Sequence, residues 1–225
     1  MTKVCVIGAK GNMGRRYMAI LAHLGVEAVG VDVDDDDEPG QLKGITHYIV
    51  AVPTYRHVWV LRQLTSFYRP QNTDAGHRIL CEKPVTKDRA ELEYLERRVK
   101  RGHKIYMVNQ YAYYSDQLPQ KSGITCYDYY NSGKDGIHWD CIQLIHLARG
   151  EITTLTNKSP VWRCVINGTE LNREAIDLCY VKMIRDFISD GREYGRLWGW
   201  DDIKASHEKV FRYYEDSCRG AGEER

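Results

Sequence analysis

Three glycines near the start of the chain have a spacing that suits phosphate binding. They lie in Gly8-Ala9-Lys10-Gly11-Asn12-Met13-Gly14, which follows a short apolar run and precedes a helical pattern. A glycine turn between a strand and a helix lets main-chain N–H groups approach a diphosphate, and the helix dipole favours its negative charge. The spacing G-x-x-G-x-x-G is one residue longer than the commonest fingerprint, but the strand–turn–helix setting strengthens it. We therefore expect a dinucleotide site at Gly8, Lys10, Gly11, Asn12, Met13 and Gly14.

Asp32 is the candidate for the second half of this fingerprint. It ends the segment EAVGVD, 21 positions after Gly11, where a carboxylate accepts a hydrogen bond from a ribose 2′-hydroxyl. Asp32 and the aspartates at positions 34–37 would repel the 2′-phosphate of NADP, so we expect NAD(H) to be favoured over NADP(H). Two alternatives stay open: the four later aspartates also suit a solvated loop, and Lys10 is able to contact a phosphate.

Two further polar segments follow apolar runs. Val52-Pro53-Thr54-Tyr55-Arg56-His57 comes after one run, and Glu82-Lys83-Pro84 after the next. Both should lie at the carboxyl ends of parallel strands, where open α/β sheets bind their ligands. We expect contacts to the dinucleotide from Val52, Pro53, Thr54, His57, Glu82 and Lys83.

The elements that must position these residues alternate between short apolar runs and longer helical patterns. Strands are expected at Lys3–Ile7, Val26–Val31, Thr46–Val52, Arg78–Cys81 and Lys104–Asn109, and helices at Asn12–Leu24, Tyr55–Phe67 and Asp88–Arg101. This alternation predicts an α/β fold with an N-terminal Rossmann domain, a doubly wound parallel sheet, over residues 1–109. The segment Asp34–Ile45 is too short for a well-formed crossover helix.

The pattern changes after Asn109 and predicts a second, reduced α+β domain over residues 110–225. Strands are expected at Ile124–Tyr130, Leu155–Thr156, Val161–Ile166 and Thr169–Leu171, with a tight turn at Asn167-Gly168. Helices are expected at Ile137–Ala148, Arg173–Ser189 and Asp201–Tyr214, the last of which could pack back on the first domain.

Composition argues against several classes of protein. The 225 residues include 32 Lys+Arg and 31 Asp+Glu, a formal net charge of +1, whereas nucleic-acid binders usually show a basic excess. There is no signal-peptide pattern and no apolar run of the ~20 residues that span a bilayer, so we expect no membrane partner and a soluble, cytoplasmic protein. The seven cysteines include no C-x-x-C pair, which favours reduced thiols and no metal site.

The order and spacing of the glycine turn, V-P-T-x-x-H and E-K-P resemble the glucose-fructose oxidoreductase/inositol dehydrogenase (Gfo/Idh/MocA) family. The resemblance covers residues 1–109 and reappears in Gly136-Ile137-His138, which is similar to the family's G-x-H segment, and in Tyr180–Phe187 and Trp200–Ile203. The G-x-x-G-x-M-G pattern of the glycine turn is also similar to that of dihydrodipicolinate reductase. That enzyme's paired-histidine segment has no match here, and E-K-P favours the first family.

The resemblance implies an NAD(P)-dependent oxidoreductase that transfers a hydride between nicotinamide and a hydroxyl or carbonyl group of a small polar, sugar- or cyclitol-like substrate. In this family the lysine of E-K-P, here Lys83, lies near the nicotinamide and the reacting oxygen. His138 would be the general acid/base, because an ordinary histidine exchanges protons near neutral pH.

Two departures from the family pattern qualify these roles. The aspartate that commonly stands four residues before the histidine is replaced by Lys134, so Asp135 or Asp140 would have to partner His138, and Asp140 could itself stand in the histidine's place. The second domain is also short, so we expect a shortened family member whose pocket is shallow or completed by another subunit of a homo-oligomer formed through this domain. The alternative is a dinucleotide-binding sensor or scaffold without turnover.

Overall fold

The computed structural model describes residues 2–32, 42–67, 77–99, 101–114, 124–129, 139, 142–147, 152–159, 163–166, 169–170 and 172–220. The chain divides into two compact units. The first contains Met1–Val108 and Val181–Trp200, and the second contains Asn109–Tyr180 and Asp201–Arg225. Nothing in the sequence pattern indicated that residues 181–200 return to the first unit.

The first unit is built on a five-stranded sheet in the order β2-β1-β3-β4-β5. Its strands are β1 (Lys3–Ile7), β2 (Glu27–Val31), β3 (His47–Val50), β4 (Arg78–Cys81) and β5 (Lys104–Met107). All neighbouring pairs are parallel. The chain adds β2 on one side of β1 and β3 on the other, so the order of the strands reverses between β1 and β3. In such sheets, ligands bind at the carboxyl ends of the strands beside this reversal.

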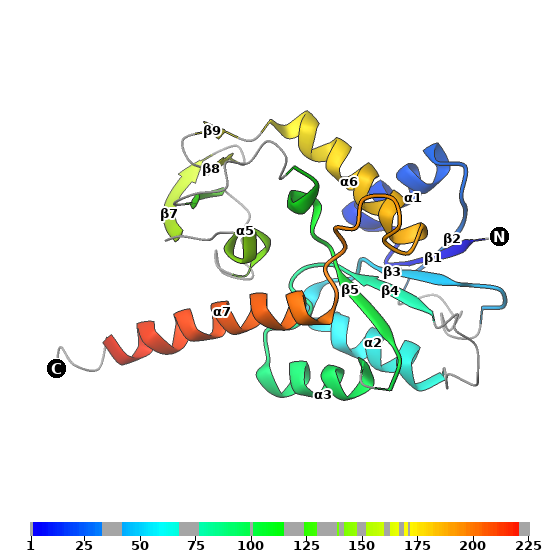
Figure 1. Ribbon diagram of the computed structural model, residues 1–225, viewed down its shortest axis with the longest axis horizontal. Coiled ribbons are helices and arrows are strands. Elements are labelled where there is room, and N and C mark those ends of the chain that lie inside the picture. The colour runs from blue at the N-terminus through cyan, green and yellow to red at the C-terminus, as the bar shows by residue number, and fades with distance from the viewer. Residues whose placement is uncertain are drawn as a thin grey trace. The chain divides into compact units, whose positions relative to one another are not determined.

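Helices cover both faces of this sheet, as Figure 1 shows: α1 (Asn12–His23) lies on one face, and α2 (Thr54–Phe67) and α3 (Arg89–Val99) lie on the other. The central strands β1 and β3 are therefore largely apolar, and residues 4–7 of β1 and 48–50 of β3 are all buried. Helix α3 begins with a sequence-encoded cap, in which Asp88 accepts a hydrogen bond from the Glu91 N–H at 3.1 Å.

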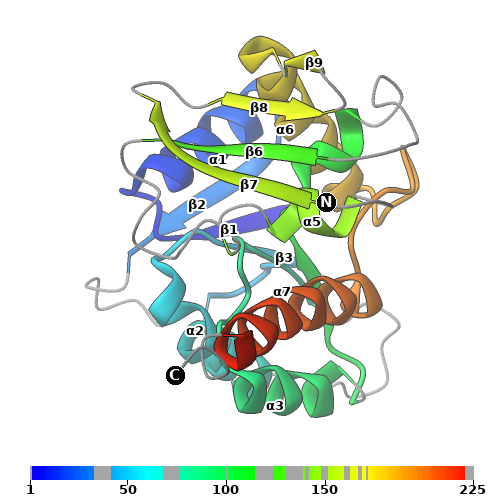
Figure 2. The ribbon, with the colours of Figure 1, turned by 90° about the vertical axis from the view of Figure 1, so that its left-hand side faces the viewer.

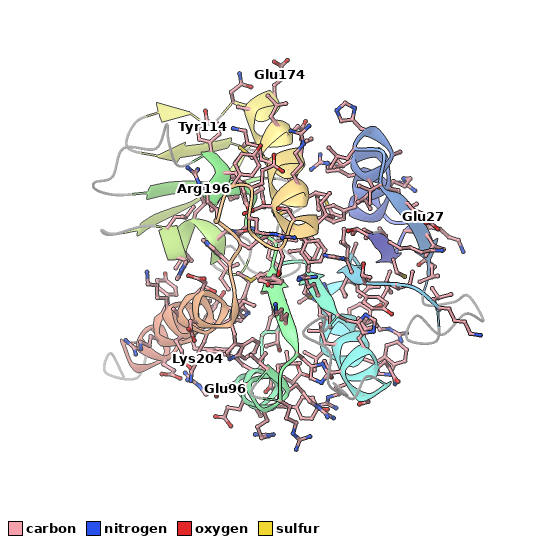
Figure 3. All side chains as sticks on the ribbon, turned by 45° about the vertical axis from the view of Figure 1, so that its right-hand side comes forward. Glu27, Glu96, Tyr114, Glu174, Arg196 and Lys204 are labelled. Atoms are coloured by element: carbon pink, nitrogen blue, oxygen red, sulfur yellow. The ribbon has the colours of Figure 1, made fainter. Side chains whose placement is uncertain are left out.

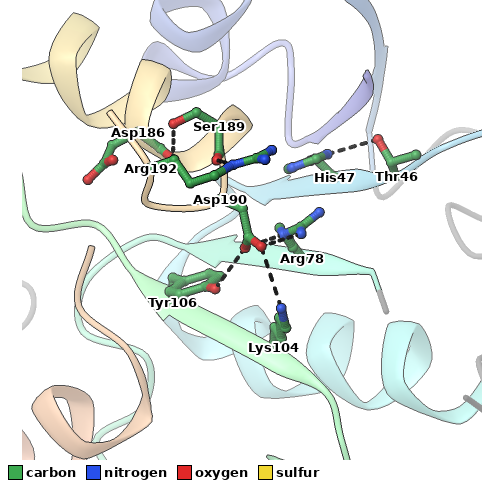
Figure 4. Close-up of polar contacts among 9 residues, drawn as sticks. All are labelled: Thr46, His47, Arg78, Lys104, Tyr106, Asp186, Ser189, Asp190 and Arg192. Carbon is green, nitrogen blue, oxygen red and sulfur yellow. Dashed lines mark hydrogen bonds and ion pairs between the residues drawn. The ribbon is translucent and has the colours of Figure 1, made fainter. Parts of the chain in front are cut away.

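The returning segment is fixed to the amino-terminal edge of this sheet by Asp190 (Figure 4). Arg78 forms a two-point ion pair with its carboxylate, Lys104 lies 3.6 Å away, and the Tyr106 hydroxyl donates to it at 3.4 Å. Hydrogen bonds from Arg78 hold the pKa of Asp190 below its usual range. Beside this group, burial, helped by the Arg78 guanidinium, lowers the pKa of His47 to about 4.

The second unit contains a four-stranded sheet in the order β7-β6-β8-β9, seen in Figure 2. Its strands are β6 (Ile124–Tyr129), β7 (Ile152–Ser159), β8 (Arg163–Ile166) and β9 (Thr169–Glu170). The β6–β7 pair is parallel, and the β6–β8 and β8–β9 pairs are antiparallel. Ile166 pairs with Thr169, in agreement with the expected turn, although Asn167 and Gly168 themselves lie outside the described residues.

The remaining elements are a 3₁₀-helix (Gln110–Tyr114), α5 (Ile142–Leu147), α6 (Arg173–Ile188) and α7 (Trp200–Gly220). Trp139, Ile142 and Ile145 pack against Val210 of α7. The Lys209 ammonium reaches the carbonyl oxygen of Ile145 at 3.4 Å, where a cation compensates the negative end of α5. Among the described helices, none is long and apolar enough to cross a membrane.

Candidate functional site

The glycine turn after β1 is held tightly against the neighbouring strands. The N–H groups of Gly8 and Ala9 donate to the Val31 carbonyl at the end of β2, at 2.9 and 3.2 Å. Gly8 has φ +89°, and a Cβ there would lie 2.8 Å from the main chain of Ala51. A Cβ on Gly14 would overlap the Gly8 carbonyl oxygen. The protein itself therefore requires glycine at positions 8 and 14.

Gly11 differs from the other two glycines. It is exposed, with φ −71° and ψ 170°, and a Cβ there would meet the Gly8 oxygen at 3.3 Å, a tight but not prohibitive contact. It precedes α1 without a side-chain cap, and the first turn of the helix contains no acidic residue. This helix start is suited to an anion, and a bare main chain at Gly11 allows a diphosphate to approach it.

Two charged side chains reach the glycine turn from opposite sides of its sequence. Asp32, directly after β2, accepts a hydrogen bond from the Lys10 main-chain N–H at 2.8 Å through Oδ2. The Arg15 guanidinium donates to the Lys10 carbonyl and, at 2.8 Å, to the Asn12 side chain. The turn thus has a carboxylate on one side and a guanidinium beside the helix start.

The segment after β3 lies against the same turn. The Ala51 N–H donates to the Ile7 carbonyl at 2.8 Å, and the Arg56 N–H to the Pro53 carbonyl at 2.8 Å where α2 begins. Val52 is buried, Thr54 is half-buried and Pro53 is exposed. Of these three residues, Pro53 is therefore the one that faces solvent at the carboxyl edge of the sheet.

His57, expected to contact the dinucleotide, is buried and contacts two main-chain carbonyl oxygens of the protein. Its side chain is only 1% exposed. Its two ring nitrogens lie 2.7 Å from the Pro84 carbonyl oxygen and 2.9 Å from the Val52 carbonyl oxygen. The imidazole joins the segment after β3 to the segment after β4.

The segment after β4 contains the E-K-P motif. Glu82 is 8% exposed and accepts hydrogen bonds from the Tyr17 hydroxyl at 2.5 Å and from the Lys83 main-chain N–H at 3.1 Å. Lys83 is half-buried, and its peptide bond to Pro84 is cis. Complete burial raises the pKa of the preceding Cys81 thiol well above its usual range, so that thiol stays neutral.

The expected cofactor residues thus come together at the carboxyl edge of the first sheet, because parallel strands end at the same edge. The opposite edge carries structural ion pairs: Glu27, labelled in Figure 3, opens β2 and contacts Lys3 at 2.7 Å. Within the described residues, no cluster of three or more His, Cys, Asp or Glu side chains suits a metal ion.

The expected proton-transfer residues and the acidic run lie outside the described residues. These are His138, its possible partners Asp135 and Asp140, Lys134, and the aspartates at positions 34–37.

Sequence reasoning missed two side chains of the site, Arg15 and Tyr17. Tyr17 lies on the buried face of α1. Helical periodicity reports which face a side chain occupies, but not which distant group its hydroxyl meets. Arg15 carries no signal beyond a basic residue one position after the glycine turn.

A parallel sheet with a glycine turn at its point of reversal and a carboxylate at the end of β2 defines the class of dinucleotide-binding Rossmann folds. No protein-family model matches the sequence, and comparison of the sequence with curated proteins finds no match. Solved structures do match the fold.

Three of these structures illustrate the similarity. A Gfo/Idh/MocA family oxidoreductase from Vibrio cholerae matches with TM-score 0.71 and 10% identity over 99% of this chain and 100% of that one. A myo-inositol dehydrogenase from Corynebacterium glutamicum matches with TM-score 0.68 and 13% identity over 98% and 97%. The WlbA (WbpB) dehydrogenase from Thermus thermophilus, in complex with NAD and UDP-GlcNAcA, matches with TM-score 0.65 and 14% identity over 93% and 94%. The chain therefore has the fold of the Gfo/Idh/MocA oxidoreductases, which confirms the predicted fold class and the resemblance at the level of fold.

Proposed function

We propose that this protein is an NAD(H)-dependent oxidoreductase that acts on a hydroxyl or carbonyl group of a small polar, sugar- or cyclitol-like molecule. One observation supports this most directly: the glycine turn, the Asp32 carboxylate bonded to it and the half-buried Lys83 all lie at the carboxyl edge of the same sheet. A diphosphate, a ribose and a reacting oxygen need groups of these three kinds.

The residues present fit a dinucleotide. The main chain at Gly11 and the start of α1 would hold the diphosphate, with Arg15 adding positive charge. Asp32 would accept from the adenosine ribose and disfavour a 2′-phosphate, which supports NAD over NADP. Val52, Pro53 and Thr54 would lie along the nicotinamide half.

The chemistry divides between the cofactor and the chain. When bound, nicotinamide supplies the hydride acceptor or donor. Lys83 would hydrogen-bond to the substrate oxygen and polarise it. His138, or Asp140 in its place, would take the hydroxyl proton during oxidation and return it during reduction. Asp135 or Asp140 would partner His138. We also propose that the second unit forms a homo-oligomer and that the protein acts in the cytoplasm.

The proposed substrate class is supported by what the similar structures are. One is named as a myo-inositol dehydrogenase, and another was crystallised with NAD and UDP-GlcNAcA. Myo-inositol and UDP-GlcNAcA both carry several hydroxyl groups, which are the groups that the proposed reaction oxidises.

The test is a fluorescence titration with NADH and NADPH, followed by turnover assays with NAD⁺ and a panel of inositols, sugars and nucleotide sugars. We expect NADH to bind more tightly than NADPH, and at least one polyol in the panel to reduce NAD⁺. Absence of NADH binding to the folded protein would contradict the proposal.

A dinucleotide-binding sensor is the second candidate, favoured by Lys134 in the place of the family's usual aspartate. It predicts NADH binding without turnover on the panel, together with no effect of Lys83→Ala on whatever response NADH induces. Turnover that depends on Lys83 would exclude it.

A further inference from the structure

Lys83 is flanked in the chain by two residues that helices on opposite faces of the sheet hold in place. Glu82, before it, is held by Tyr17 of α1. Pro84, after it, is held by His57 of α2. Figure 1 shows α1 and α2 on the two faces of the first sheet. The E-K-P segment is therefore fixed from both sides.

The Tyr17 side of this arrangement reaches the main chain of Lys83 itself. Tyr17 is fully buried and donates to one oxygen of Glu82, and the other oxygen of the same carboxylate accepts the Lys83 N–H. A buried carboxylate is stable only when its oxygens are hydrogen-bonded, and bonds to a charged acceptor are the stronger ones. Loss of the Tyr17 hydroxyl would leave Glu82 poorly satisfied and free to move, and Lys83 would move with it.

The His57 side joins the two strand ends between which Lys83 must act. The buried imidazole spans the two, with one ring nitrogen 2.7 Å from the Pro84 carbonyl oxygen and the other 2.9 Å from the Val52 carbonyl oxygen. This fixes the separation between the segment after β3, expected along the nicotinamide, and the segment that carries Lys83.

We infer that Tyr17 and His57 are positioning residues, which hold the Lys83 ammonium at the place where it meets the nicotinamide and the substrate oxygen. The inference rests on the proposed function of Lys83. It predicts that removing the Tyr17 hydroxyl displaces Lys83 while the glycine turn still binds the dinucleotide.

The test compares Tyr17→Phe with a matched control, Tyr106→Phe. Each change removes one hydroxyl that donates to a carboxylate, but Tyr106 meets Asp190 at the opposite edge of the sheet. Two quantities are measured: hydrogen–deuterium exchange across residues 82–86, and the rate at which trace acetic anhydride acetylates Lys83 with and without saturating NADH, read by mass spectrometry.

In the unmodified protein, NADH should slow acetylation of Lys83. In Tyr17→Phe, exchange at the Lys83 amide should rise about tenfold, as expected from the loss of one well-made buried hydrogen bond. The protection of Lys83 by NADH should largely disappear, while the Kd for NADH changes by less than about twofold. A general loss of structure would instead weaken the protection and the NADH affinity together. Tyr106→Phe should leave both the exchange and the protection unchanged.

Identical behaviour of the two variants would overturn the inference. Should Tyr17→Phe fail to fold, His57→Gln, which severs at least one of the two carbonyl bonds, takes its place with the same expected loss of protection. If NADH neither binds nor protects Lys83 in the unmodified protein, the proposed function is wrong. The inference that Tyr17 and His57 position Lys83 for that reaction is then wrong as well. Faster exchange at Lys83 in Tyr17→Phe would then still establish that Tyr17 holds the segment.

Discussion

The Asp32 carboxylate accepts a hydrogen bond from the Lys10 main-chain N–H at 2.8 Å. The side chain expected to select the ribose therefore also holds the glycine turn expected to bind the diphosphate. A substitution at Asp32 therefore affects both the choice of nucleotide and the hold on the glycine turn, and two different substitutions distinguish these effects.

Asp32→Asn keeps an oxygen that can accept from Lys10 but removes the negative charge. We expect the preference for NADH over NADPH to fall by about tenfold, since a hydrogen bond to a charged group is lost and the repulsion of a 2′-phosphate is relieved. Parallel fluorescence titrations with both nucleotides measure the ratio. Asp32→Ala, the control, should also weaken binding of both nucleotides, because it releases the turn. A ratio unchanged in Asp32→Asn would mean that Asp32 does not contact the ribose.

Gly11 and Gly14 should respond differently to the same added methyl group. Gly14→Ala forces a Cβ into the Gly8 carbonyl oxygen, and we expect a loss of about 1–3 kcal/mol in the free energy of unfolding. Gly11→Ala should cost less than about 1 kcal/mol, because its φ suits any residue, yet it should weaken NADH binding more than tenfold by blocking the approach of the diphosphate. Urea unfolding and NADH titration together give both quantities. Full NADH affinity in Gly11→Ala would place the diphosphate elsewhere.

Lys83→Met removes the ammonium but keeps a side chain of similar length. We expect NADH to bind with nearly unchanged Kd, and kcat on a substrate found in the panel to fall by at least about a hundredfold, the usual scale for a lost proton-transfer or polarising group. Steady-state kinetics provide the measurement. Undiminished turnover would remove Lys83 from the reaction.

The pH dependence of stability should carry the signature of His47. Its side chain is 3% exposed and its pKa in the folded protein is about 4, whereas an unfolded histidine has a pKa of about 6.5. The unfolded state therefore gains the proton first as the pH falls, and stability is lost between about pH 6.5 and 4. From pH 7 to pH 5 this group alone should cost about 2 kcal/mol. The pKa values of His77, His103 and His146 are also lowered, so these side chains act in the same direction.

Urea unfolding at pH 7 and pH 5, for the unmodified protein and His47→Gln, tests this expectation. The variant should lose less stability over this range than the unmodified protein. Equal losses would show that His47 is not held neutral by its surroundings.

Asp190→Asn addresses the ion pair at the other edge of the sheet. Asparagine tolerates the φ of +61° found there, so the change removes mainly the charge that Arg78 and Lys104 face. We expect a loss of about 1–2 kcal/mol at pH 7, measured by urea unfolding, with NADH affinity unchanged. The pKa of Asp190 is lowered in the folded protein, so this contribution is present above the pKa of an unfolded aspartate, about 3.9, and is lost as the pH falls below it. If the variant is as stable as the unmodified protein, the ion pair of Asp190 makes no net contribution to the free energy of unfolding.

The sequence by itself determined the elements and the edge at which they place the site. The strands at Lys3–Ile7 and Arg78–Cys81 have the predicted bounds, and the three helices of the first unit begin and end within two residues of expectation. The elements are predictable because strands that are buried on both faces of a parallel sheet consist of local runs of apolar residues. The turn is predictable because positions 8 and 14 approach neighbouring main chain too closely for any residue but glycine.

Only the tertiary structure decided which distant side chains meet. Three features join positions far apart in the chain: the hydrogen bond from Tyr17 to Glu82, the contact of the His57 ring with the Pro84 carbonyl oxygen, and the ion pair of Asp190 with Arg78. The type of a side chain shows whether it can donate or accept a hydrogen bond. Its partner, however, depends on how whole helices and strands pack together, and this packing leaves no local pattern in the sequence.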